Sequence, residues 1–170
     1  MTMTMRDVRI GKVVVNIGVG EGGDKLAKAE KVLQMVARQK PVQTLARQSI
    51  RDWGVRENSP IGAKVTLRGD PATDFLKRAL EVRSRRLPDY VFDAFGNFSF
   101  GIGDYTDFEG MKYDPEIGVF GMDVSVSLVR PGFRVKDRRV ARGRLPRRHR
   151  VSRAEAIEFA AQTFQVEVFQ

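Results

Sequence analysis

The sequence predicts an α+β fold in which a mainly antiparallel sheet has helices packed on one face, together with an arginine-rich C-terminal arm. Short runs of alternating apolar and polar residues are typical of half-buried strands, and runs with apolar residues every three or four positions are typical of amphipathic helices. The two kinds of run alternate irregularly, which favours α+β over the steady strand–helix order of a parallel sheet. Arginine is concentrated in one segment near the C-terminus.

Five runs are predicted to form strands. Three of them alternate cleanly, with an apolar face and a face that carries mainly Lys, Arg, Ser, Thr or Asn: residues 12–17, 63–68 and 124–129. The run 42–50 is less regular. In the run 95–102, one face carries Phe98, Phe100 and Ile102. The sheet is therefore expected to have one apolar face and one polar, basic face.

Three helices are predicted to cover the apolar face. The first spans about residues 24–39, and the second begins at Asp70, a capping residue followed by a proline at the first helical position. The third follows Ser152, which forms a capping-box pattern with Glu155. The predicted core stripes are Leu26, Ala29, Leu33 and Val36 in the first helix and Phe75, Leu76, Ala79, Leu80 and Leu87 in the second. The third helix is predicted to run through Ile157, Ala161 and Phe164.

Length and composition indicate one globular domain, residues 1–170, with a basic arm at about 130–151 and a short C-terminal helix from about 153. No apolar run approaches the roughly 20 residues that span a bilayer, and the first ten residues do not resemble a signal peptide, so a cytoplasmic protein without a membrane partner is expected. The chain has no cysteine and one histidine, His149, which argues against thiolate or histidine metal sites and against a Ser-His-Asp triad.

The net charge is unevenly distributed along the chain. Residues 130–153 contain eleven Lys or Arg and one acidic residue, whereas the whole chain has a net charge of only +9. Residues 38–86 contain 12 basic and 5 acidic residues, and residues 87–129 contain one basic and 8 acidic residues. A solvated surface explains most short charge runs, but a segment this basic favours binding of a polyanion, because neutralised phosphates release their counterions.

A glycine motif raises the alternative of a nucleotide-dependent enzyme. Gly18, Gly20 and Gly23 follow an apolar run and precede a predicted helix, in the spacing of a dinucleotide-binding turn. However, no acidic residue stands between the end of the predicted helix and Asp52 to bind a ribose hydroxyl, and Glu21 would repel a pyrophosphate. The sequence therefore favours a tight strand-to-helix turn whose glycines accept positive φ, and it implies no cofactor.

No other combination of residues indicates an enzyme. Asp104 and Asp107 are typical of solvated loop acids, and His149 lies in an arginine-rich segment suited to contact with phosphate or solvent. What remains is a basic, polar sheet face, the arm and a long loop, residues 49–62. Lys and Arg bind phosphates, while Asn, Gln and Thr bond 2′-hydroxyls and base edges, so this combination suits RNA.

Five ordered motifs resemble one family over nearly the whole chain: "KVVVNIGVGEGG", "QKPVQTLARQSI", "PIGAKVTLRGD", "FDAFGNFSFGI" and "GVFGMDVSVSL". They are similar to the universal large-subunit ribosomal protein five family, the 5S-rRNA-binding proteins of the central protuberance, called protein eleven in eukaryotes. "KYDPEIGVFGMDV", "RPGFRVKDRR" and "HRVSRAEAIEF" resemble its archaeal and eukaryotic branch, and the absence of an N-terminal extension suggests an archaeal type.

The resemblance implies which residues contact RNA. It places 5S rRNA on the exposed sheet face, at Asn16, Gln39 and Thr66, and strand parity adds Lys40, Thr44, Arg47, Lys64 and Arg68. The loop 49–62 matches a family loop that contacts the elbow of the peptidyl-site tRNA, with Arg51, Trp53 and Arg56 as expected contacts. The arm cations expected to bind rRNA are Arg134, Lys136, Arg138, Arg139, Arg142, Arg144, Arg147, Arg148 and Arg150.

The function predicted from these observations is that of a non-enzymatic structural constituent of the large ribosomal subunit, located in the cytoplasmic ribosome. Its expected partners are 5S rRNA, large-subunit rRNA, peptidyl-site tRNA and other proteins of the central protuberance. The acidic side of the chain is a candidate for contact with the head of the small subunit. A free-standing RNA-binding regulator or chaperone that uses the same basic face is the alternative.

Overall fold

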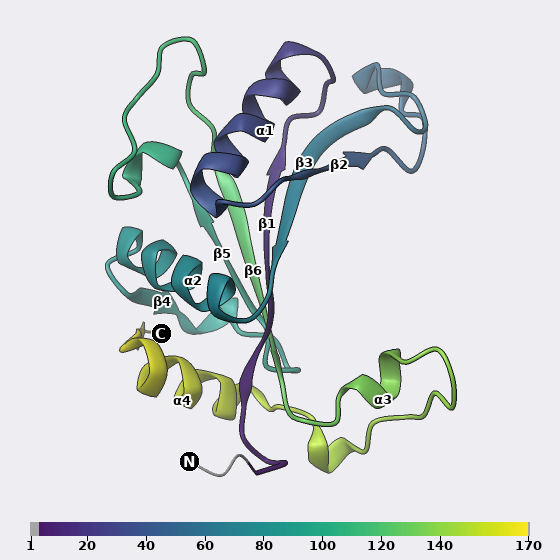
Figure 1. The fold of residues 1–170 in the computed structure, drawn as a ribbon, viewed down its shortest axis with the longest axis vertical. Helices are drawn as coiled ribbons and strands as arrows, with labels where there is room; N and C mark the ends of the chain where they lie inside the picture. Colours follow the sequence, from purple (N-terminus) through teal and green to yellow (C-terminus); the bar gives the residue numbers. More distant parts are fainter. Residues whose placement is uncertain (1–3, 170) are drawn as a thin grey trace. The chain divides into compact units, whose positions relative to one another are not determined.

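The computed structural model describes residues 4–169 (Figure 1). The main strands are β1 (Arg9–Gly18), β2 (Val42–Leu45), β3 (Pro60–Leu67), β5 (Phe98–Ile102) and β6 (Met122–Val129), and two short strands are β4 (Arg86–Pro88) and β7 (Glu167–Phe169). The helices are α1 (Asp24–Ala37), α2 (Asp70–Val82), α3 (Arg134–Asp137) and α4 (Arg153–Phe164). Single 3₁₀ turns are η1 (Arg51–Trp53), η2 (Asp89–Val91), η3 (Tyr105–Asp107) and η4 (Arg147–His149).

The predicted α+β class is confirmed. A mainly antiparallel five-stranded sheet has the strand order β2-β3-β1-β6-β5, and β4 pairs with β7 in a small parallel sheet. Within the described residues, no helix is both long and apolar enough to cross a membrane.

The chain divides into two compact units. Of the described residues, unit 1 comprises 4–13, 68–99 and 125–169, and unit 2 comprises 14–67 and 100–124. Strands β1, β5 and β6 contribute residues to both units. The prediction of one domain over residues 1–170, whose first three and last residues lie outside the described part, stays a prediction.

Strand alternation is confirmed for the runs with clean parity. Val13, Val15 and Ile17 of β1 are buried, as are the alternate residues of β3, β5 and β6: Ala63, Val65 and Leu67; Phe98, Phe100 and Ile102; Val124, Val126 and Leu128. The strand expected over 42–50 is shorter than predicted, because β2 ends at Leu45 after an irregularity in its pairing with β3. Ile50 instead forms an isolated bridge with Val55.

The core of unit 2 forms where α1 packs against β3. All four predicted core residues of α1 are buried, and Val32 and Ala37 join them. Burial of a Val or Leu side chain stabilises a fold by about 1.5–3 kcal/mol, so this stripe supplies much of the helix's stability. A residue in the left-handed conformation, Arg38 with φ 53°, ends the helix.

In unit 1, α2 buries Phe75, Leu76, Ala79 and Leu80 as predicted, but two details differ from the prediction. The N-cap is Gly69, with φ 64°, and Asp70 is already the first helical residue. Leu87 is buried on β4 and not on α2, because the chain leaves the helix after Val82.

The start of α4 was predicted correctly, and the helix runs through the three predicted residues. The capping box of Ser152 and Glu155 is present. The buried residues are Ala156, Ala160 and Phe164, whereas the predicted Ile157 is half-buried and Ala161 is exposed. Apolar residues occur on several sides of this helix, so periodicity alone could not select the buried one.

The glycine motif forms the predicted strand-to-helix turn. Gly20 and Gly23 have φ of 84° and 90°, and Gly23 is the N-cap of α1, although Gly18 does not have a positive φ. The backbone N–H groups of Val19 and Gly20 both donate to the carbonyl of Ile61, at 3.0 and 2.8 Å. These groups therefore bond β3 and are not available to a pyrophosphate.

Candidate nucleic-acid interface

Unit 2 has an open sheet face opposite α1. The register pairs Val42 with Lys64, Gln43 with Ala63 and Thr44 with Gly62. Gln43 lies on the covered side, because its amide donates to Glu30 of α1 at 2.7 Å. Thr44 and Lys64 therefore lie on the other face, together with Val42, which is 63% exposed. Sequence reasoning missed this apolar member of the face, although the parity of the strand already indicated its position.

Asn16 of β1 lies beside Lys64 on this open face. A Cβ on Gly62 would come within 2.8 Å of the Ile17 carbonyl and of Thr44 Oγ1, so only glycine allows three strands to pack this closely. Ile61 bonds Val19 and Gly20, and Gly62 contacts Ile17 and Gly18, so β1 and β3 run in opposite directions. Gly62 lies beside Gly18. Because the strands are antiparallel, Lys64, two residues after Gly62, therefore lies beside Asn16, two residues before Gly18.

The polar groups of this face are available for binding. Asn16 and Thr66 are half-buried, whereas Lys64 is exposed. Among residues 4–169, none of these three side chains has a hydrogen-bond partner or an ion pair. The open face therefore presents two short polar groups fixed on strands, beside the cation of Lys64. Gln39 and Lys40 are exposed in the connection between α1 and the edge strand β2.

One residue that strand parity assigned to the sheet face, Arg47, is placed elsewhere. Arg47 follows the end of β2 and lines a hollow with Trp53 and Gly20. The irregularity between Thr44 and Leu45 breaks the alternation from which its position was inferred. Arg68 directly follows β3, is exposed and keeps the alternation of Lys64 and Thr66, and its guanidinium donates to the Gly11 carbonyl at 3.4 Å.

The loop 49–62 forms a braced hairpin. Ile50 and Val55 exchange backbone hydrogen bonds of 2.8 and 3.1 Å, and the Ser49 hydroxyl accepts from the backbone N–H of Glu57 at 2.9 Å. The tip is the 3₁₀ turn η1, where Trp53 is 76% exposed. An apolar hollow of 640 Å³ lies beneath the tip, lined in part by Val19, Ile50, Trp53, Val55 and Ile61. Arg51 and Arg56 are exposed on the same loop.

The basic arm, residues 130–151, lies in unit 1 and is folded back on itself (Figure 1). It contains α3 and η4, and His149 Nε2 lies 2.6 Å from the Pro131 carbonyl, which brings its two ends together. The nine arm cations predicted to bind rRNA are all exposed.

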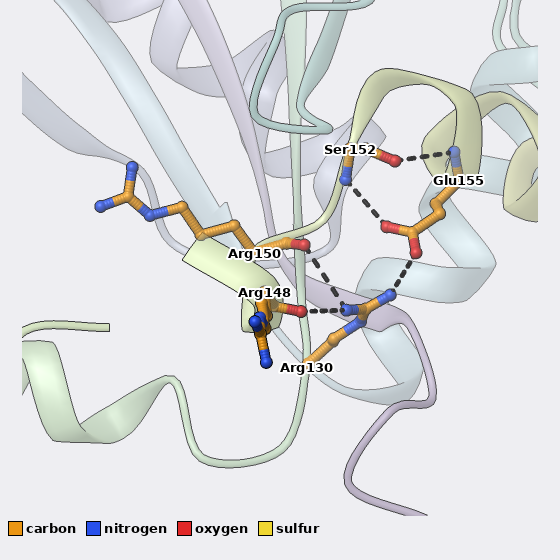
Figure 2. A network of polar contacts seen from close by, with 5 residues as sticks. All are labelled: Arg130, Arg148, Arg150, Ser152 and Glu155. Atoms are coloured by element: carbon orange, nitrogen blue, oxygen red, sulfur yellow. Dashed lines mark hydrogen bonds and ion pairs between the residues drawn. The ribbon is translucent and has the colours of Figure 1, made fainter. Parts of the chain in front are cut away.

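Arg130 anchors the arm, as Figure 2 shows. Only 8% of its surface is exposed, and its guanidinium donates to Glu155 at 2.6 Å and to the carbonyls of Arg148 and Arg150 at 3.5 Å. Arg153 is also paired, with Asp89 at 2.6 Å. Two of the eleven cations in the basic segment therefore stabilise the fold, and the other nine face solvent.

The capping box and the anchor share one carboxylate. The backbone N–H of Ser152 donates to Glu155 at 2.9 Å, and this hydrogen bond lowers the pKa of the Glu155 carboxyl from its ordinary value of 4.5. Arg130 acts in the same direction and desolvation opposes both. Because the pKa is lowered on folding, the stabilisation is present at neutral pH and is lost as the pH falls through the lowered pKa.

Nothing in this geometry indicates catalysis or metal binding. In the described part of the chain, no group of three or more His, Asp or Glu residues could hold a metal ion. The exposed groups instead form two kinds of polar surface: short uncharged groups and Lys64 on strands, and the cations of the arm.

Comparison with known proteins agrees with the resemblance seen in the sequence. The family described as "Ribosomal protein L5" matches residues 4–56, and the family described as the C-terminus of the same ribosomal protein matches residues 60–159. A large ribosomal subunit protein uL5 of Thermoplasma volcanium is 53% identical over 165 residues, which cover 96% of this chain and 97% of the relative.

Further relatives support the archaeal type. The uL5 protein of Sulfurisphaera tokodaii is 51% identical over 98% of this chain and 94% of its own length, and that of Methanoregula boonei is 48% identical over 96% and 99%. These values favour the ribosomal interpretation over the free-standing regulator. The chain belongs to the ribosomal protein L5 family and is a structural, non-enzymatic constituent of the large subunit of the cytoplasmic ribosome.

Proposed function

We propose that this chain binds 5S rRNA and helps to anchor it in the central protuberance of the large subunit. The observation that carries the proposal is the open face of unit 2, where Asn16 and Thr66 are half-buried without partners beside Lys64. Short polar groups on rigid strands can bond ribose hydroxyls and base edges at fixed positions. Gln39 and Lys40 extend this surface beside the edge strand, with Thr44 on β2.

The basic arm supplies the electrostatic part of the binding. Its nine exposed cations follow the backbone of large-subunit rRNA, because guanidinium groups bind phosphates without regard to sequence. Arg47 joins the loop 49–62, and Arg68 adds a cation in unit 1.

The loop 49–62 contacts the peptidyl-site tRNA. Its hairpin presents Arg51, Trp53 and Arg56 on a braced support, and exposed loops on rigid scaffolds commonly carry function. Other proteins of the central protuberance are further partners. The acidic segment 87–129 faces proteins of the small-subunit head.

Replacement of Asn16, Gln39 and Thr66 by Ala tests the 5S rRNA site. Each substitution is expected to lose roughly 1–3 kcal/mol where it leaves a desolvated RNA group unpaired. Filter binding should show weaker binding of 5S rRNA with an unchanged salt dependence, because no charge is removed. Binding of an unrelated RNA of the same length is the control and should hardly change. Wild-type affinity of this triple variant for 5S rRNA would reject the site.

A further inference from the structure

A hollow of 480 Å³ lies in unit 1. Ser127 and Leu128 of β6 line it, together with the turn that carries Phe95 and Asn97 and several residues of the basic arm. Sites for small molecules and single chemical groups have volumes of about 300–1,000 Å³. The hollow is therefore large enough to receive one nucleotide.

The charges around the hollow favour an anionic group. The lining includes Lys136, Arg142, Arg144 and Arg150 and no acidic residue. Nε of Arg142 donates to the Lys136 carbonyl at 2.5 Å, which fixes that wall. The side chains of Arg144 and Arg150 have no partner among residues 4–169, so they are available to a phosphate.

One wall of the hollow carries an exposed aromatic ring on a rigid turn. Phe95 is 60% exposed, and both its backbone N–H and that of Asn97 donate to Asp93, at 2.8 and 2.7 Å. Gly96 has φ 76°, and a Cβ there would lie 2.6 Å from a methyl group of Val151. The backbone of the turn is therefore closely packed against the end of the arm, and it presents the exposed Phe95 ring, which has no partner ring among residues 4–169.

Asn97 adds a directional polar group. Its amide nitrogen donates to Asp93 at 2.7 Å, which leaves the amide oxygen as an acceptor. An acceptor at the edge of an aromatic surface suits the exocyclic amine of a nucleobase.

We propose that this hollow receives one unpaired nucleotide of RNA, with its base stacked on Phe95, its exocyclic amine bonded to Asn97 and its phosphate held by Arg144 and Arg150. A hollow lined only by cations would select any phosphate, and a ring alone would select any planar group. Their combination selects a nucleotide that has left its helix, since a paired base presents no open face. The inference rests on the proposed RNA-binding function and adds the requirement that one nucleotide of the bound RNA is unpaired.

The test compares two RNA hairpins of the same stem, one fully paired and one with a single bulged 2-aminopurine. We expect the full-length protein to bind the bulged hairpin about tenfold more tightly and to quench its fluorescence, because stacking on an aromatic ring contributes roughly 1–3 kcal/mol per base. Phe95→Ala should abolish both effects, and Phe95→Tyr should retain them. The exposed Tyr90 of the same unit provides the control, since Tyr90→Ala should keep the discrimination.

A second pair of variants separates the hollow from overall charge. Arg144 lines the hollow and Arg139 does not, although both are exposed cations of the arm. Arg144→Ala should reduce the preference for the bulged hairpin, and Arg139→Ala should weaken binding of both hairpins equally. Equal affinity of the wild type for the two hairpins, or full discrimination by Phe95→Ala, would overturn the inference while 5S rRNA binding stands. Failure of the wild type to bind 5S rRNA would overturn both proposals.

Adenosine monophosphate distinguishes the source of the nucleotide. We expect no saturable binding below about millimolar concentration, because a free nucleotide lacks the additional phosphate contacts that the arm makes with RNA. Micromolar binding of adenosine monophosphate would assign the hollow to a free nucleotide and would overturn the proposed RNA ligand.

Discussion

The open face of unit 2 and the basic arm of unit 1 both expose polar groups, but they hold them differently. On the face, Asn16 and Thr66 project from paired strands and are half-buried. On the arm, the cations are exposed on a loop whose ends are held by Arg130 and His149. Uncharged groups in fixed positions can form hydrogen bonds with one particular RNA surface. The long, flexible side chains of Lys and Arg can instead bind phosphates on many different RNA surfaces. The two regions are therefore expected to differ in specificity and in salt dependence.

Shortening the arm should have the largest effect. The contact between His149 and Pro131 brings the ends close, so a short Gly-Ser linker can replace residues 134–147. This change removes seven of the nine exposed arm cations. Each lost phosphate contact lowers the slope of log affinity against log salt by about 0.7–0.9, so four contacts would lower it by about 3. Filter binding to large-subunit rRNA at several salt concentrations measures this slope, and an unchanged slope would show that the arm does not bind phosphates.

Release of the arm's anchor is expected to have the next largest effect. Arg130→Ala removes hydrogen bonds to a carboxylate and two carbonyls, and should lower the free energy of unfolding by about 1.5–3 kcal/mol. The matched control is Arg153→Ala, which removes the more exposed pair with Asp89 and should lower it by about 0–1 kcal/mol. Urea denaturation compares the two variants. Equal losses would show that burial of Arg130 adds nothing to the anchor.

The loop 49–62 should have the smallest effect on RNA binding by the isolated protein. Substituting Arg51 and Arg56 by Ala should leave 5S rRNA binding within about twofold, because both residues lie on the hairpin and not on the open face. Reconstituted ribosomes with this variant should retain peptidyl-site tRNA about fivefold less well, as the two exposed, solvent-screened contacts together contribute about 1 kcal/mol. Normal tRNA retention with weakened 5S rRNA binding would reverse the assignments of the two surfaces.

Prediction from the sequence was accurate where the local alternation of apolar and polar residues was strong, and less accurate where that pattern was weak. The buried residues of β1, β3 and β6 were predicted correctly because each strand alternates without interruption. Arg47 was misplaced because the irregularity after Thr44 arises from pairing between strands, which a single strand does not record. The buried face of α4 could not be assigned from the sequence, because apolar residues lie on several of its sides.

Long-range contacts account for the remaining differences. The arm's charge was evident from the sequence, but its folded path depends on Arg130 contacting Glu155, 25 residues away. The hollow beside Phe95 likewise combines three separate segments of the chain. The periodicity of a single segment does not indicate which distant segments contact one another. The isolated Phe95 beside Gly96 was nevertheless a local signal of an exposed ring on a turn.

Tethered hydroxyl-radical probing tests the central claim, that the open face of unit 2 contacts 5S rRNA, most directly. The chain has no cysteine, so an iron chelate can be attached at a single introduced site. Val42→Cys places the probe on the open face, and Lys31→Cys places it at an exposed position on α1, which covers the opposite side of the sheet. In assembled large subunits, we expect strand cleavage of 5S rRNA from the Val42 site and little from the Lys31 site. Cleavage from Lys31 with none from Val42 would contradict the account.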